Sequence, residues 1–137
     1  MFTRTYKTEA VVLKRRNSGE ADRIVTLFTK NYGKVVGVAK AVRRINSKRS
    51  GILEPATQAV FFLARGKTFD IITQIDLITS FQLTRQNLSR LTQVQQLLEV
   101  VDLLSSEHQS HPVVYQLLVD GLQALNSTGG KRTGLVE

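Results

Sequence analysis

The sequence contains no cysteine, only two histidines and no long apolar run. Without cysteine, the chain cannot form disulfides, thiolate zinc sites or a cysteine nucleophile. Residues 59–64 are an unbroken apolar stretch, but they are far too few to span a bilayer, and residues 10–13 are too few for the core of a signal peptide. We therefore expect a soluble, cytoplasmic protein that does not enter a membrane.

Acidic residues are also scarce, and the excess of positive charge lies in one half of the chain. Eleven Asp and Glu face nineteen Lys and Arg, which gives a net charge of +8. Residues 1–80 hold fifteen basic and six acidic residues, whereas residues 81–137 hold four and five. A strongly basic surface attracts polyanions such as nucleic acid, anionic lipid or acidic protein tails. The binding region is therefore expected in the N-terminal half.

No set of residues suited to covalent catalysis or metal binding stands out. His108 and His111 lie in an expected loop without nearby cysteines. Residues 66–68 (Gly-Lys-Thr) resemble the end of a phosphate-binding P-loop, but Phe61 stands where that motif requires glycine. We expect a simple hairpin turn at residues 66–68, and a protein that is not an enzyme and needs no cofactor or metal.

The first half of the chain has the pattern of a small barrel or sandwich. Short runs of β-branched and aromatic residues alternate with glycine-containing turns, which is typical of antiparallel strands. Five strands are expected, at residues 5–16, 23–30, 35–41, 56–65 and 69–79. Closure of these strands into a barrel would hide the sheet edges. A five-stranded antiparallel barrel is the prediction for residues 1–80.

From about residue 84, apolar residues recur every three or four positions, which indicates helices. We predict one helix near 84–105 and a second near 111–126, where a polar cap and an early proline suit a helix start. Both helices have wide apolar faces that need a partner surface. The predicted class is therefore α+β, with residues 81–137 as the start of a helical domain.

Ten basic residues of the N-terminal half are the candidate contacts to nucleic acid. Phosphate binding needs several cations on one face, because each contact releases condensed counterions. Residues 40–49 are the densest stretch, with five cations and no acid. With residues 14–16 and Lys34, they are predicted to form one continuous cationic track. The candidates are Lys14, Arg15, Arg16, Arg23, Lys34, Lys40, Arg43, Arg44, Lys48 and Arg49.

Aromatic side chains in the same half are possible stacking platforms for bases. Most of them fall within apolar strands, so core packing is the default interpretation. Tyr32 is the exception, because it lies in an expected turn between two lysines. Phe61 and Phe62 must point to opposite faces of a regular strand, so one of them is available to a partner or to the helices. The aromatic set is Tyr6, Phe28, Tyr32, Phe61, Phe62 and Phe69.

An ordered series of short segments resembles the RecO family of recombination mediators. Residues 8–16 are similar to that family's opening strand, and residues 20–29 to its acidic-aspartate-arginine turn and second strand. The series covers nearly the whole chain. It continues with residues 32–34 (Tyr-Gly-Lys), 38–40 (Val-Ala-Lys), 43–44 (Arg-Arg), Ser47, 77–81 (Leu-Ile-Thr-Ser-Phe) and 88–91 (Leu-Ser-Arg-Leu).

The resemblance implies an OB barrel followed by a helical domain. It implies binding to single- and double-stranded DNA, strand annealing, and help in loading the RecA recombinase, in the cytoplasm and associated with the nucleoid. It also implies contacts with RecR and with the acidic tail of the single-stranded-DNA-binding protein. Members are usually longer, and many carry a four-cysteine zinc site in their later part. We therefore expect this chain to be the front piece of such a protein.

Two other functions remain open from the residues alone. A basic barrel also suits an RNA-binding protein of translation or ribosome assembly, because charge does not separate RNA from DNA. The helices could instead serve a protein–protein adaptor whose basic half meets acidic tails. A DNA-binding and annealing module without covalent chemistry is the leading hypothesis.

Overall fold

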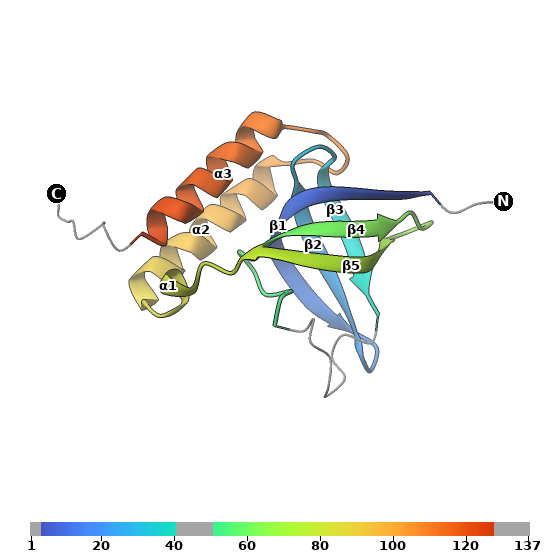
Figure 1. Ribbon diagram of the computed structural model, residues 1–137, viewed down its shortest axis with the longest axis horizontal. Coiled ribbons are helices and arrows are strands. Elements are labelled where there is room, and N and C mark those ends of the chain that lie inside the picture. The colour runs from blue at the N-terminus through green and yellow to red at the C-terminus, as the bar shows by residue number, and fades with distance from the viewer. Residues whose placement is uncertain (1–3, 41–50, 128–137) are drawn as a thin grey trace.

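The computed structural model describes residues 4–40 and 51–127, and it places a β-barrel beside two long helices (Figure 1). The strands are β1 (Thr5–Ser18), β2 (Asp22–Thr29), β3 (Gly33–Ala39), β4 (Gln58–Ala64) and β5 (Asp70–Thr79). The helices are α1 (Gln82–Arg85), α2 (Leu88–Leu104) and α3 (Pro112–Leu125). The predicted α+β class, with a five-stranded barrel followed by helices, is confirmed.

The five strands close in the order β1-β2-β3-β5-β4, and β4 pairs back onto β1. Four of the five strand pairs are antiparallel, as predicted. The fifth, between β3 and β5, is parallel and short, with Gly37 opposite Asp70 and Val38 opposite Ile71. The difference arises because β3 and β5 are not consecutive: β4 lies between them in the chain and reverses the direction once more.

β1 is the central strand, because it takes part in both halves of the barrel. Its first part pairs with β4 and its second part with β2, and the register with β2 shifts between Val12 and Lys14. Residues 10–13 are all buried because both faces of the strand are covered. Ala10 and Val12 belong to the core inside the barrel, whereas Val11 and Leu13 belong to a second core under the helices.

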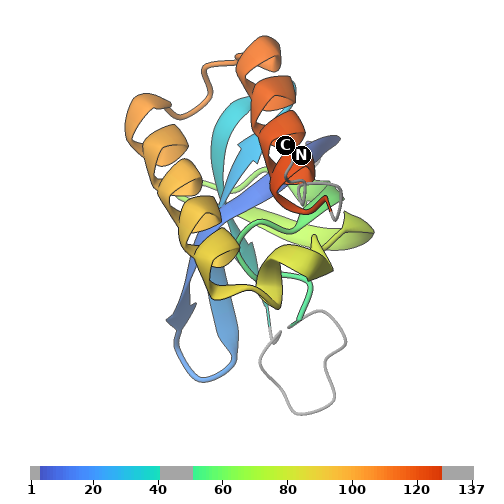
Figure 2. The same ribbon diagram turned by 90° about the vertical axis from the view of Figure 1, so that its left-hand side faces the viewer.

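The helices cover one side of the barrel, where α2 and α3 lie side by side and run in opposite directions (Figure 2). α2 begins where the side-chain oxygen of Asn87 accepts a hydrogen bond from the backbone N–H of Arg90 at 3.0 Å. α3 begins at Pro112, as predicted. The extra turn α1 was not foreseen, and it breaks the predicted helix at residues 84–105 into two pieces.

Tyr115 ties α3 to the barrel. It is 1 % exposed, and its ring centroid lies 6.3 Å from that of Phe28. Its hydroxyl donates to the Glu9 carboxylate at 3.3 Å and accepts from the side-chain amide of Gln58 at 3.2 Å. Burial raises the pKa of Tyr115, and the nearby Glu9 charge raises it further, while the hydrogen bond from Gln58 opposes them. The hydroxyl therefore stays protonated and continues to donate its hydrogen bond.

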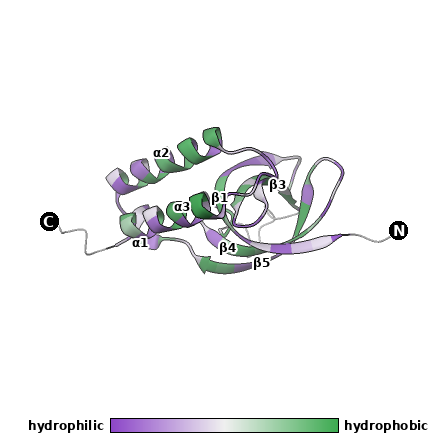
Figure 3. Ribbon diagram, turned by 90° about the horizontal axis from the view of Figure 1, so that it is seen from above, coloured by the Kyte–Doolittle hydropathy of each residue, from purple (hydrophilic) through white to green (hydrophobic). Residues whose placement is uncertain are grey.

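Several apolar side chains of the helices remain exposed. Leu103, Leu104 and Val113 have exposed fractions of 82, 81 and 73 %. Figure 3 shows apolar residues gathered at the end where α2 stops and α3 starts. Within the described ranges, no helix is long and apolar enough to cross a membrane.

Candidate nucleic-acid interface

Two of the predicted basic residues meet on one carboxylate of α2. Lys14 Nζ lies 2.8 Å from Asp102 Oδ2, and Lys34 Nζ lies 3.0 Å from Oδ1 and 2.9 Å from the Asp102 carbonyl oxygen. The Lys14 side chain is 64 % exposed, but that of Lys34 is only 17 % exposed. Burial by itself would raise the pKa of Asp102, but the hydrogen bonds and charges of the two lysines outweigh it and lower that pKa. Lys34 therefore fastens α2 to the barrel.

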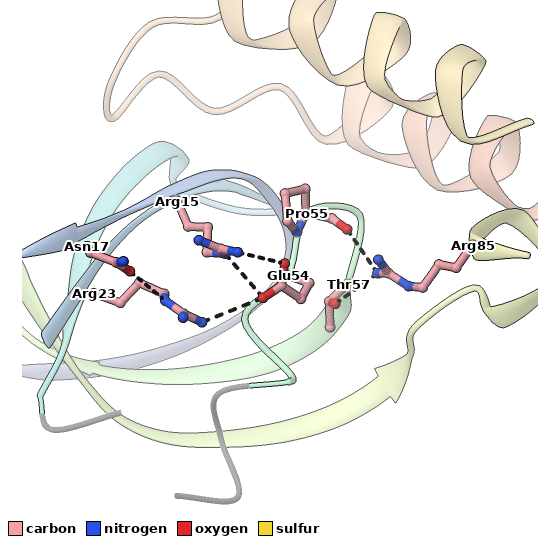
Figure 4. A network of polar contacts seen from close by, with 7 residues as sticks. All are labelled: Arg15, Asn17, Arg23, Glu54, Pro55, Thr57 and Arg85. Atoms are coloured by element: carbon pink, nitrogen blue, oxygen red, sulfur yellow. Dashed lines mark hydrogen bonds and ion pairs between the residues drawn. The ribbon is translucent and has the colours of Figure 1, made fainter. Parts of the chain in front are cut away.

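A second carboxylate, that of Glu54, gathers two of the predicted arginines (Figure 4). Arg15 Nε and Nη2 donate to the two Glu54 carboxylate oxygens at 3.2 and 3.1 Å. Arg23 Nη1 lies 3.6 Å from Glu54, and Arg23 Nε donates to the Asn17 side chain at 3.4 Å. The side chain of Arg15 is 32 % exposed and that of Arg23 only 10 %. Arg15 is thus the member of this pair that an outside ligand can reach.

The remaining described candidates are exposed residues near the ends of β1 and β3. Arg16 is exposed and makes no ion pair within the described part of the chain. Lys40 Nζ lies 3.6 Å from Asp22 Oδ2, and the Lys40 side chain is 65 % exposed. The four candidates Arg43, Arg44, Lys48 and Arg49 lie outside the described residues.

Folding thus brings together Lys14 with Lys34 and Arg15 with Arg23, and it brings an acid to each pair. Sequence reasoning missed these acids because Asp102 and Glu54 lie far from their partners along the chain; Asp102 is 68 positions from Lys34. The predicted basic segments themselves contain no acidic residue. In the folded chain, however, ion pairs with Asp102 and Glu54 neutralise much of their charge. Whether they form one track stays a prediction.

Sequence reasoning also missed a second group of basic residues, at the end of the barrel away from the helices (Figure 1). All four are exposed, and within the described ranges none makes an ion pair. They come from the start of β1 and from the β4–β5 turn. Alternation along the first strand indicated an outward position for Lys7, and the expected turn indicated exposure of Arg65 and Lys67. The group is Arg4, Lys7, Arg65 and Lys67.

Most aromatic residues pack in the cores, as expected. Phe61 is buried inside the barrel, and its neighbour Phe62 is only partly buried, in keeping with their predicted opposite faces. Tyr32 lies in the expected turn, where its ring packs against that of Tyr6 with centroids 4.8 Å apart. Burial and a hydrogen bond to Asp70 raise the pKa of Tyr6. The Tyr6–Tyr32 pair packs against the core inside the barrel.

The β4–β5 connection is the hairpin turn that was predicted in place of a P-loop. The backbone N–H of Gly66 donates to Asp70 Oδ1 at 3.2 Å, and a Cβ on Gly66 would lie 2.1 Å from the Phe69 carbonyl oxygen. Glycine is therefore required there by close packing. Among the described residues, no group of three or more His, Asp or Glu side chains is placed to hold a metal ion.

Known proteins resemble this chain over most of its length. Residues 1–81 match the family model described as "Recombination protein O N terminal". Proteins named "DNA repair protein RecO" are similar: that of Nocardioides sp. is 43 % identical over 88 % of the chain, and that of Dehalococcoides mccartyi is 37 % identical over 90 %. The corresponding protein of Pelotomaculum thermopropionicum is 32 % identical over 88 %. The matches cover 50, 49 and 47 % of these relatives, so the chain spans about half their length.

Proposed function

The chain belongs to the RecO family of DNA repair proteins, and on that premise we propose that its barrel binds single- and double-stranded DNA through the phosphate backbone. The main observation behind this proposal is that three consecutive basic residues, Lys14, Arg15 and Arg16, are exposed on the second part of β1. They belong to the half of the chain that has fifteen basic and six acidic residues. Contacts to phosphate carry no direct sequence information, so binding is nearly blind to base identity.

We assign different roles to the described basic residues. Lys14, Arg15, Arg16 and Lys40 face the DNA, because their side chains are the more exposed. Exposed ion pairs contribute only about 0–1 kcal/mol, so phosphate can replace their carboxylates at little cost. The nearly buried Arg23 and Lys34 hold the surface in shape. The other predicted DNA contacts, Arg43, Arg44, Lys48 and Arg49, lie outside the described residues and stay a prediction.

We propose that the same surface also promotes the annealing of complementary strands. Two DNA strands repel each other through their phosphates, and a basic surface that neutralises both lets complementary bases pair. We propose that residues 1–80 are the DNA-binding domain, that residues 81–137 belong to a helical domain, and that no step involves covalent chemistry. Assistance in loading the RecA recombinase, together with contacts to RecR, is proposed from family membership.

Binding of an acidic protein tail, such as that of the single-stranded-DNA-binding protein, is a further proposal. A groove of about 800 Å³ lies between β1 and α2, and its lining includes the apolar Leu13 and Leu103, the cation Lys14 and the acids Glu99 and Asp102. Apolar walls suit the apolar side chains of such a peptide, and its acidic side chains would compete with Asp102 for Lys14. This groove would serve the adaptor role that the sequence left open.

Direct competition tests the proposed function. The chain is mixed with labelled single-stranded DNA, and unlabelled duplex DNA or RNA of equal length is added. We expect both DNA forms to compete and complementary strands to anneal faster in the presence of the chain. Preference for RNA, with no acceleration of annealing, would favour the RNA-binding alternative. Binding to an acidic peptide but to no nucleic acid would favour the adaptor.

A further inference from the structure

A cation, an aromatic ring and an amide form one row across three strands on the outside of the barrel. Lys7 of β1 is paired with Phe62 of β4, which is paired with Gln74 of β5. Phe61 points into the barrel, so Phe62 points outward. Lys7 Nζ lies 5.7 Å from the centroid of the Phe62 ring, within cation–π range. This row takes no part in either hydrophobic core.

A shallow groove of about 430 Å³ surrounds the row. Its lining includes Thr5 and Thr73 besides Lys7, Phe62 and Gln74. The Gln74 side-chain N–H₂ donates to both carboxylate oxygens of Asp76, at 3.1 and 3.3 Å. No described residue donates to the Gln74 side-chain oxygen, which remains available as an acceptor.

The charges around the groove favour an anionic ligand. Arg4, Lys7, Arg65 and Lys67 are exposed at this end of the barrel, and none of them makes an ion pair within the described residues. This differs from the second part of β1, where Asp102 and Glu54 occupy the cations. A ligand with phosphate groups therefore displaces no carboxylate here.

We propose that this row is a stacking site for an unpaired base of single-stranded DNA, with the base on Phe62 and Lys7 on an adjoining phosphate. The proposal rests on the proposed DNA-binding function and deepens it. Aromatic rings beside a basic groove bind single strands without regard to sequence, because every base has a π-face. Lys7 is exposed, and among the described residues its ammonium group pairs only with the ring, so it can swing to a phosphate when a base takes its place. A duplex keeps its bases stacked and cannot use the site.

Fluorescence reports on the stacking directly, because the chain has no tryptophan. Phe62→Trp keeps a platform and adds a single reporter, while Leu88→Trp places the reporter at the start of α2, where Leu88 is 81 % exposed. We expect single-stranded oligothymidine to quench Phe62→Trp but not Leu88→Trp. An abasic strand of the same length and charge should quench neither. Equal quenching by the abasic strand would overturn the proposal.

Affinity gives the second arm of the test. Phe62→Leu keeps an apolar strand residue but removes the platform, so affinity for oligothymidine should fall roughly tenfold, the size of one stacking contact, and duplex affinity should not change. If neither changes while the chain binds both DNA forms, the stacking site is wrong and the proposed function stands. If the unaltered chain binds neither form, the proposed function itself fails. Saturation of the groove by an apolar peptide instead of DNA would assign it to a protein partner.

Discussion

The carboxylate of Glu54 holds the guanidinium of Arg15 in a two-pronged pair, with donor–acceptor distances of 3.2 and 3.1 Å across 39 positions of sequence (Figure 4). The pair links the second part of β1 to the segment that leads into β4. Paired Arg–carboxylate geometry is stronger and more specific than a single contact. The charge of Arg15 is therefore partly neutralised within the protein, and Glu54 competes with phosphate for this arginine.

Glu54→Gln should increase DNA affinity. The change removes one negative charge and frees Arg15 for phosphate, so we expect up to about fivefold tighter binding, the worth of an exposed ion pair. The measurement is a binding titration at low salt, with folding checked by thermal melting. Weaker binding in a folded variant would mean that Glu54 instead orients Arg15 toward DNA.

Asp102→Asn should loosen the helices from the barrel. Two charge-assisted hydrogen bonds from Lys14 and Lys34 would be weakened, so unfolding free energy should drop by about 1–3 kcal/mol. Chemical denaturation at neutral pH measures the loss. Asp120→Asn is the matched control, since Asp120 is an exposed residue of α3 whose carboxylate, among the described residues, accepts a hydrogen bond only from the Gln116 side chain. Equal losses in both variants would contradict the role of Asp102.

The stabilisation that Asp102 gives the folded chain should disappear in acid. Its pKa is lowered in the folded protein, so the unfolded chain takes up the proton first as the pH falls. The stabilisation is complete above the ordinary carboxylate pKa of about 3.9 and is lost as the pH falls through the folded value. The stability difference between the unaltered chain and Asp102→Asn should therefore be constant near neutrality and shrink below about pH 4. A difference that persists unchanged in strong acid would rule out this charge mechanism.

Gly33→Ala should destabilise the fold much more than Gly19→Ala. Both glycines have positive φ, 70° and 61°, so both substitutions carry a backbone penalty of about 1 kcal/mol. A Cβ on Gly33 would also lie 2.3 Å from the Gln109 carbonyl oxygen, whereas nothing lies within 4 Å of one on Gly19. We expect Gly33→Ala to lower the melting temperature by several degrees more. Equal melting temperatures would show that the β2–β3 turn does not pack on the α2–α3 loop.

The strands and helices were largely predictable because their signals are local. Alternation gave β1 to β5 within a few residues, and the early Pro112 gave the start of α3. The burial of all four residues 10–13 is harder to predict from the local sequence, because it depends on the helices that cover the outer face of β1. The parallel β3–β5 pair depends on how the barrel closes, which no local pattern records.

The site was less predictable, because charge counts along the chain do not show which acids folding brings close. Asp102 and Glu54 reach the predicted cations from distant positions. Arg85 illustrates the same limit. Its position in the near-neutral helical half suggests a surface residue, but its guanidinium donates to the carbonyl oxygens of Ser80 and Pro55 at 2.6 and 2.9 Å. Burial lowers the pKa of Arg85, and its substitution would test stability rather than binding.

The central claim, that a basic barrel grips the phosphate backbone, is tested most directly by salt. Affinity for single-stranded DNA is titrated at several salt concentrations for the unaltered chain, for the quadruple alanine variant of Arg43, Arg44, Lys48 and Arg49, and for Arg90→Ala as the control. Engagement of about five phosphates predicts a log–log slope of roughly −3.5, a shallower slope for the quadruple variant, and no change for Arg90→Ala. A flat dependence on salt in the unaltered chain would contradict the account.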